Sequence, residues 1–136
     1  MNELGILHEQ ATVKAFIQKE RQDRCLFLLS HPSRRRDFTD QLAHFKWFDA
    51  RFARSIPPTT AHTAEEIVAL LRRKGAGSRA WVISEWSELD AQEIALEDVV
   101  HRVWGGDMGT IVSCIPGKLG FFRGEDMKSE LVLDHP

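Results

Sequence analysis

Cys114 has the most recognisable chemistry of any residue in this chain, because a cysteine thiol can act as a nucleophile. It lies in the segment Ser113-Cys114-Ile115-Pro116-Gly117. A catalytic thiol needs a lowered pKa, which a base, a cation or a helix N-terminus can supply. His101, Lys118 and Arg123 are candidate activators. If alternation along a strand turns Cys114 toward the core, the thiol is instead a packing group, which is its commoner role.

Polar residues at the ends of two predicted strands form a second group. The apolar segments 79–84 and 109–115 predict strands, and the roughly 24 residues between them are enough for a parallel crossover. Parallel sheets bind ligands at the carboxyl ends of their strands. We therefore expect a pocket there, with Cys114 and Glu85 as candidate catalytic residues. Its expected ligand-binding residues are Ser84, Glu85, Ser113 and Lys118.

The acidic segment 85–90 also has a simpler interpretation, as a solvated loop that caps the following helix. Metal and cofactor binding are not predicted. The six histidines are scattered, and none stands at zinc-ligand spacing from another histidine or a cysteine. The glycine-rich segment 105–109 precedes a strand, whereas a phosphate cradle needs glycines between a strand and a helix.

A basic and aromatic segment between residues 34 and 54 is the predicted partner surface. Arginine binds phosphates and carboxylates with two parallel hydrogen bonds, and aromatic rings can stack on bases. Three consecutive arginines in the first turn of a helix oppose the helix dipole, which indicates a negatively charged partner. That partner is the acidic half of another subunit, another protein or a nucleic acid, and the alternative is a solvated face. The residues concerned are Arg34, Arg35, Arg36, Lys46, Trp47 and Arg51.

Composition describes an ordinary globular protein. The chain has 136 residues, of which 43% are hydrophobic and 28% charged, and its net charge is −2. Residues 21–79 carry 12 Lys/Arg against 6 Asp/Glu, and residues 80–136 carry 4 against 11. These halves either neutralise each other where they pack or pair head to tail between two copies. The other two interpretations are that the basic half faces an acidic partner, or that the two halves are solvated faces of different sign. With no signal-like N-terminus, no apolar run that could span a membrane and only two cysteines, the expected location is cytoplasmic.

Periodicity predicts helices in the first half of the chain. Residues 11–29 fit either one long helix or two consecutive ones, and a new helix starts after Pro32, with Phe38, Leu42 and Phe45 on one face. The segment 46–61 reads as an extended connector. Thr63 and Glu66 have the spacing of a capping box, so a helix starts there and closes at Gly75.

The second half is predicted to be rich in strands, with a helix at about 96–104. Pro116-Gly117 predicts a turn, followed by strands at 118–123 and near 131–133. We expect one α/β or α+β domain over residues 1–136, helical over 1–75 and strand-rich over 79–136. Its N-terminal helices would pack on a small mixed sheet of three or four strands.

Three phrases of the sequence resemble a group of short bacterial cytosolic proteins with no established activity. They are RRDFTDQLAHF (35–45), VISE with ELD (82–85 and 88–90), and MGTIVSCIPGKL (108–119). The resemblance covers roughly residues 20–125. It implies a bacterial, cytosolic, single-domain protein and assigns no catalytic residue or cofactor.

Three functions remain open from the sequence. The first is a non-enzymatic interaction or regulatory module that self-associates through opposed charge. The second is a small enzyme or ligand binder that uses the strand-end pocket near Ser84, Glu85, Ser113 and Cys114. The third is a nucleic-acid-associated protein that uses the segment 34–54.

Overall fold

The computed structural model describes residues 2–56, 63–104, 106, 108–125 and 130–136. Two long helices open the chain, and short elements follow before the strand-rich half. The helices are α1 (Glu3–Phe16), α2 (Lys19–Ser30), α3 (Arg35–Thr39), α4 (Ala64–Arg73) and α5 (Leu96–Trp104), with a 3-10 turn at Leu42–His44. The strands are β1 (Ala53–Ser55), β2 (Arg79–Ser84), β3 (Gln92–Ala95), β4 (Thr110–Ile115), β5 (Leu119–Arg123) and β6 (Glu130–Asp134).

All six strands belong to one sheet with the order β1-β6-β5-β4-β2-β3. Every neighbouring pair is antiparallel. The fold is therefore α+β in a single domain, and the prediction of a mixed sheet with three or four strands was wrong. The two unpredicted strands, β1 and β3, lie at the sheet edges. Both are short and only partly buried, so neither shows a clear apolar pattern.

The strands β2 and β4 are neighbours, as predicted, but they run in opposite directions. Ile83 pairs with Ile111, and Ser84 at the end of β2 pairs with Thr110 at the start of β4. The chain between them makes a β2–β3 hairpin before it enters α5. The hairpin adds one reversal of chain direction, so β4 pairs antiparallel with β2 instead of parallel.

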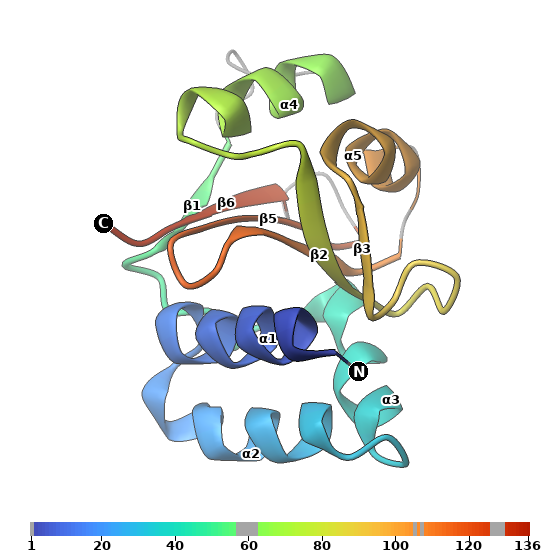
Figure 1. Ribbon diagram of the computed structural model, residues 1–136. Coiled ribbons are helices and arrows are strands. Elements are labelled where there is room, and N and C mark those ends of the chain that lie inside the picture. The colour runs from blue at the N-terminus through green and yellow to red at the C-terminus, as the bar shows by residue number, and fades with distance from the viewer. Residues whose placement is uncertain (1, 57–62, 105, 107, 126–129) are drawn as a thin grey trace.

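Helices cover both faces of the sheet (Figure 1). On one face lie α4 and α5, which enclose a core with Val82, Val112 and Phe121. On the other face lies α1, with α2 and α3 on its far side, around a core that includes Phe16, Ile83 and Phe122. The apolar run of β2 is thus buried on both sides. The predicted N-terminal helical layer forms only one of the two coverings.

The helix boundaries follow local signals. The first predicted helical region is two helices, separated at Ile17, whose extended backbone pairs with Phe48. The Thr63 hydroxyl caps α4 by accepting a hydrogen bond from the Glu66 amide at 3.1 Å, which confirms the predicted start. The helix after Pro32 ends sooner than its apolar stripe indicated, because Leu42 already lies in the 3-10 turn.

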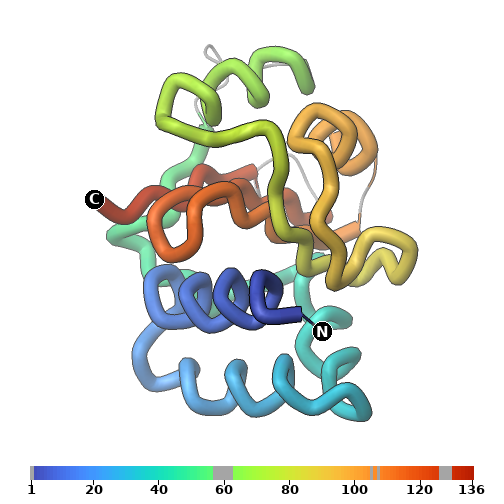
Figure 2. Tube along the Cα trace, viewed as in Figure 1, coloured from blue at the N-terminus to red at the C-terminus, as the bar shows by residue number. Residues whose placement is uncertain are grey.

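The turn between β4 and β5 packs against α1. Gly117 has φ +72°, as the predicted turn requires, and a Cβ there would lie 3.4 Å from the Ala11 Cβ. Figure 2 shows this orange turn directly above the blue helix α1. Within the described ranges, no helix combines the length and apolar character needed to cross a membrane. Part of the predicted connector, residues 57–62, lies outside the described residues, and its earlier part contains β1.

One buried hydroxyl in this fold yields a stability prediction. Thr39 is fully buried, and its Oγ1 is the one such side-chain atom in the described residues without a hydrogen-bond partner. A buried, unpaired hydroxyl is unfavourable. We expect Thr39→Val to leave stability unchanged or raise it by up to roughly 1 kcal/mol, measured by chemical denaturation.

The same substitution at Thr110 serves as the control. Thr110 is also fully buried, but its Oγ1 lies 2.7 Å from the Ser84 Oγ and 3.2 Å from the Met108 carbonyl oxygen. Thr110→Val should cost roughly 1–3 kcal/mol because it removes both of these buried hydrogen bonds. Equal losses from both variants would contradict the assignment of Thr39 as unpaired.

Candidate functional site

The antiparallel pairing separates the residues of the predicted strand-end pocket. Ser84 lies at the end of β2, whereas Ser113 pairs with Trp81, three positions further along the strand. At about 3.3 Å per residue, this amounts to about 10 Å. Lys118 lies beyond the opposite end of β4, in the β4–β5 turn. The expected pocket near Ser84, Glu85, Ser113 and Cys114 therefore does not form, because the two carboxyl ends do not share a rim.

Ser84 and Glu85 instead hold the loop after β2. The Ser84 Oγ accepts a hydrogen bond from the Trp86 amide at 2.9 Å. The Glu85 Oε1 accepts one from the Gly109 amide at 3.0 Å, while the Glu85 amide donates to the Gly109 carbonyl oxygen. These bonds tie the loop to the start of β4, a structural use that the sequence did not predict.

Cys114 lies in the core between the sheet and α4 and α5. Burial raises the pKa of its thiol to about 12, so the thiolate that a nucleophile requires does not form near neutral pH. Cys25 lies in the core on the other face, where burial, opposed by Arg21 and Arg24, raises the pKa of its thiol to about 11. Both thiols are free. Cys114 is thus the packing thiol of the alternative interpretation.

This placement predicts the reactivity of both thiols. In the folded protein, neither cysteine should react with an aromatic disulfide reagent between pH 7 and about pH 9, because burial blocks access and suppresses ionisation. In denaturant both should react promptly. Absorbance of the released thiolate measures both states. Fast reaction of one thiol in the native protein, lost in Cys114→Ala, would restore Cys114 as a nucleophile candidate.

Arg35 does not lie on an exposed basic surface as predicted, because its side chain is part of a buried ionic network. Its guanidinium donates to Glu9 at 2.8 and 2.6 Å, and to Asp90 at 2.7 and 3.0 Å. Glu9 also accepts from the Trp81 indole N–H at 2.9 Å, and Asp90 accepts from the Ser84 amide at 3.0 Å. The network joins α1, α3, β2 and the loop before β3. It supplies the negative partner that the three consecutive arginines indicated, within the same molecule.

Hydrogen bonding keeps this guanidinium charged. Burial acts to lower the pKa of Arg35, but its hydrogen bonds to Glu9 and Asp90 outweigh burial and raise it above the ordinary value. Each carboxylate meets the planar guanidinium in two-point geometry, which lysine cannot reproduce. The network is a structural anchor for the helical layer.

A second buried polar cluster lies beside this network. His8 Nδ1 lies 2.7 Å from the Ser113 Oγ, and the Thr12 hydroxyl donates to the same oxygen at 3.4 Å. Burial lowers the pKa of His8, and the nearby charge of Glu93 opposes that shift. Sequence reasoning missed this histidine–serine pair because the partners are 105 residues apart. Both side chains are buried, so the pair holds α1 against β4.

The other residues of the predicted basic surface are dispersed. Arg34 pairs with Asp37 and Arg36 with Asp40, both on the same short stretch of chain. Trp47 lies under the guanidinium of Arg21, at 4.7 Å. Arg35, between Arg34 and Arg36, is taken up by the ionic network and does not belong to an exposed row. The segment 34–54 therefore does not present the continuous row of cations on which the nucleic-acid interpretation depended.

The opposite charges of the two halves are matched in part within one molecule. Four Lys/Arg ion pairs among the described residues join residues 21–79 to residues 80–136: Arg35–Asp90, Arg72–Glu97, Lys74–Asp134 and Arg79–Glu93. Internal pairing between the two parts of the chain therefore accounts for part of the charge separation. In the part of the chain that the structure describes, no group of three His, Cys, Asp or Glu residues could hold a metal ion.

The open edge of β3 is the most distinctive unpaired feature of the sheet. Among the described strands, β3 pairs only with β2. Arg79 and Glu93 stand on its α1 side, with Nε and Oε1 3.5 Å apart, and both are about half exposed. Leu4 and Leu7 are exposed on α1, and Leu4 lies one helical turn before His8, whose ring stacks on Trp81 of β2, the neighbour of β3. We call these four side chains and the outer edge of β3 the β3 edge surface.

Comparisons with family models, with curated proteins and with solved structures found no match. The resemblance to short bacterial proteins therefore gains no support from them.

Proposed function

We propose that this protein is a non-enzymatic interaction module that self-associates through the β3 edge surface. The observation that carries the proposal is the unpaired edge of β3 beside two exposed leucines and a neutral pair of opposite charges. The occupant is a second copy of the chain, placed by a two-fold axis so that the two β3 strands pair antiparallel.

Backbone hydrogen bonding supports this arrangement. An edge strand presents a row of N–H and C=O groups that another strand can pair with. Natural proteins commonly block such edges with a lone charge or a proline. Here the segment 92–95 has no proline, and its one charged residue, Glu93, is balanced by Arg79. The Glu93 carbonyl oxygen accepts a hydrogen bond from the Arg79 guanidinium at 2.9 Å, and a second strand would have to displace that bond to pair there.

Charge placement favours a second copy over an unrelated partner. In an isologous interface, each surface meets its own image, so a patch that carries both signs can be complementary to itself. Arg79 of one copy can then face Glu93 of the other, and the reverse pair forms by symmetry. Leu4 and Leu7 add apolar area whose burial favours association. Leu7 is 56% exposed in the single chain, so this area is available.

A charge-swap series tests the proposal by sedimentation over a range of protein concentrations. The wild-type protein should form a dimer, weakened moderately by salt. Glu93→Arg places two positive charges at each end of the interface and should weaken the dimer roughly tenfold or more. The double variant Arg79→Glu/Glu93→Arg restores opposite charges and should recover dimerisation.

Asp98→Arg is the matched control, since it makes the same change of charge at an exposed position on α5, which covers the opposite face of the sheet. It should leave the dimer unaffected. A wild-type monomer at every concentration would refute self-association. A dimer that Glu93→Arg weakens no more than Asp98→Arg does would refute the β3 edge as its interface.

A further inference from the structure

We propose that the groove at the junction of α1 and α2 is a binding site for a small phosphate ester. The groove has a volume of about 670 Å³, within the range of small-ligand sites. It lies at the C-terminal end of α1, away from the β3 edge surface at the N-terminal end. We call it the elbow groove, and its principal lining residues are Lys14, Gln18, Lys19, Arg51, Phe52 and His135.

Backbone hydrogen bonds hold one wall of the elbow groove in place. The Gln18 amide donates to the Trp47 carbonyl oxygen at 2.8 Å, and the Asp49 amide donates to the Phe16 carbonyl oxygen at 2.7 Å. The Gln22 side chain also donates to the Ile17 carbonyl oxygen at 2.9 Å. This wall is therefore formed before any ligand arrives, which lowers the entropic cost of binding.

The opposite wall is attached to the sheet. The Asp134 amide donates to the Phe52 carbonyl oxygen and the His135 amide to the Lys118 carbonyl oxygen, each at 2.9 Å. The rings of Phe52 and His135 stack with their centroids 4.0 Å apart. They give the groove a flat, partly apolar wall against which the organic part of a ligand can lie.

Arg51 is held in position for an anion. Asp49 accepts hydrogen bonds from the Arg51 amide, Nε and Nη2, and these bonds lower the pKa of the Asp49 carboxyl. The Arg51 guanidinium also lies 5.0 Å from the centre of the Phe52 ring. Its Nη1 has no partner among the described residues, and the side chain is 77% exposed. An oriented guanidinium with free N–H groups is suited to phosphate.

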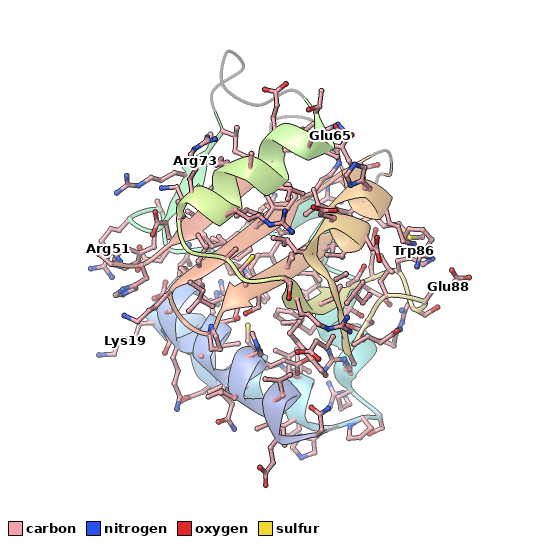
Figure 3. The ribbon with its side chains drawn as sticks, turned by 45° about the horizontal axis from the view of Figure 1, so that its top comes forward. Lys19, Arg51, Glu65, Arg73, Trp86 and Glu88 are labelled. Carbon is pink, nitrogen blue, oxygen red and sulfur yellow. The ribbon has the colours of Figure 1, made fainter. Side chains whose placement is uncertain are left out.

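Two lysines complete a positive site. Lys14 and Lys19 line the same groove, and neither forms an ion pair in the described part of the chain. Figure 3 shows Lys19 and Arg51 on the same side of the molecule. Asp49 is already paired with Arg51, so Glu20 is the one remaining carboxylate of the lining. The lining therefore carries an excess of positive charge, which favours an anionic ligand.

The same lining favours a small ligand over a nucleic-acid strand. A bound strand needs a continuous track of cations and exposed aromatic platforms. Here Glu20 and Asp49 interrupt the cations, and the neighbouring face of Trp47 is occupied by Arg21. The open groove has room for one phosphate group with a short organic body.

Phenyl phosphate is a suitable probe, because it joins a phosphate monoester to a flat ring. In an NMR titration, its amide shifts should be confined to the groove residues, and it should bind more tightly than inorganic phosphate or phenol. Arg51→Gln and Lys19→Gln should each lower the affinity roughly tenfold. Arg73→Gln, at an exposed position on α4, is the matched control and should leave the affinity unchanged (Figure 3).

Three results would overturn the proposal. The first is the absence of saturable binding, and the second is an equal loss of affinity in Arg73→Gln and Arg51→Gln. The third is much tighter binding of a short single-stranded oligonucleotide to the same residues, which would assign the groove to nucleic acid. Arg51 and Lys19 are exposed, so the variants should keep the wild-type melting temperature and remain interpretable.

Discussion

Replacing Arg35 with methionine should destabilise the protein by about 3–5 kcal/mol. The substitution leaves Glu9 and Asp90 buried without their cation, while both still accept hydrogen bonds from the Trp81 indole and the Ser84 amide. The loss arises because two buried negative charges remain without a counter-charge. Chemical denaturation of the wild-type protein and the variant measures it.

Two further variants separate the ionic effect from a packing effect. Arg34→Met removes the neighbouring arginine, whose pair with Asp37 is exposed, and should cost no more than about 1 kcal/mol. Glu9→Gln/Arg35→Met removes one buried negative charge but keeps an acceptor for the Trp81 indole. It should recover part of the stability lost in Arg35→Met. If Arg34→Met and Arg35→Met are equally destabilised, the buried network does not carry the stability assigned to it.

Gly109→Ala should destabilise the protein by about 3 kcal/mol or more. A Cβ at this position would lie 2.2 Å from the Leu42 carbonyl carbon and 2.3 Å from the Ala43 nitrogen. These are backbone atoms of the 3-10 turn and cannot rotate away, so either the turn or the start of β4 must move. Movement of β4 would also weaken the two hydrogen bonds between Gly109 and Glu85.

Gly77→Ala is the matched control for this steric argument. A Cβ on Gly77 would meet nothing within 4 Å, and the residue is exposed. Its stability should change by no more than about 0.5 kcal/mol. Thermal unfolding of the two variants under the same conditions provides the comparison. A Gly109→Ala protein as stable as Gly77→Ala would show that the 3-10 turn does not press on the start of β4.

Much of the local structure could be predicted from the sequence. The helix at 64–73, the strands at 79–84 and 110–115, and the helix at 96–104 appear where periodicity and capping placed them. The break near Pro32 and the turn at Pro116-Gly117 also appear as predicted. These features depend on residues a few positions apart, so the chain itself contains the information.

The prediction of a strand-end pocket was wrong because the apolar strands were expected to run parallel. A continuous apolar run shows that both faces of a strand are covered, and parallel strands are the commonest case. In this protein, α1 and α5 cover the two faces of an antiparallel sheet instead. The direction of β4 relative to β2 depends on β3, a four-residue edge strand with little apolar signal.

The sequence alone also could not predict which groups the charged residues pair with. Arg35 was read as part of an exposed basic row, and one of its carboxylates comes from Asp90, 55 residues away. Side-chain types and short-range spacing determine where helices and strands begin and which residues are buried. They also indicate that an arginine needs a counter-charge. Strand direction, the burial of Arg35 and the walls of the elbow groove arise only when distant segments pack, because each depends on contacts between residues that no local pattern connects.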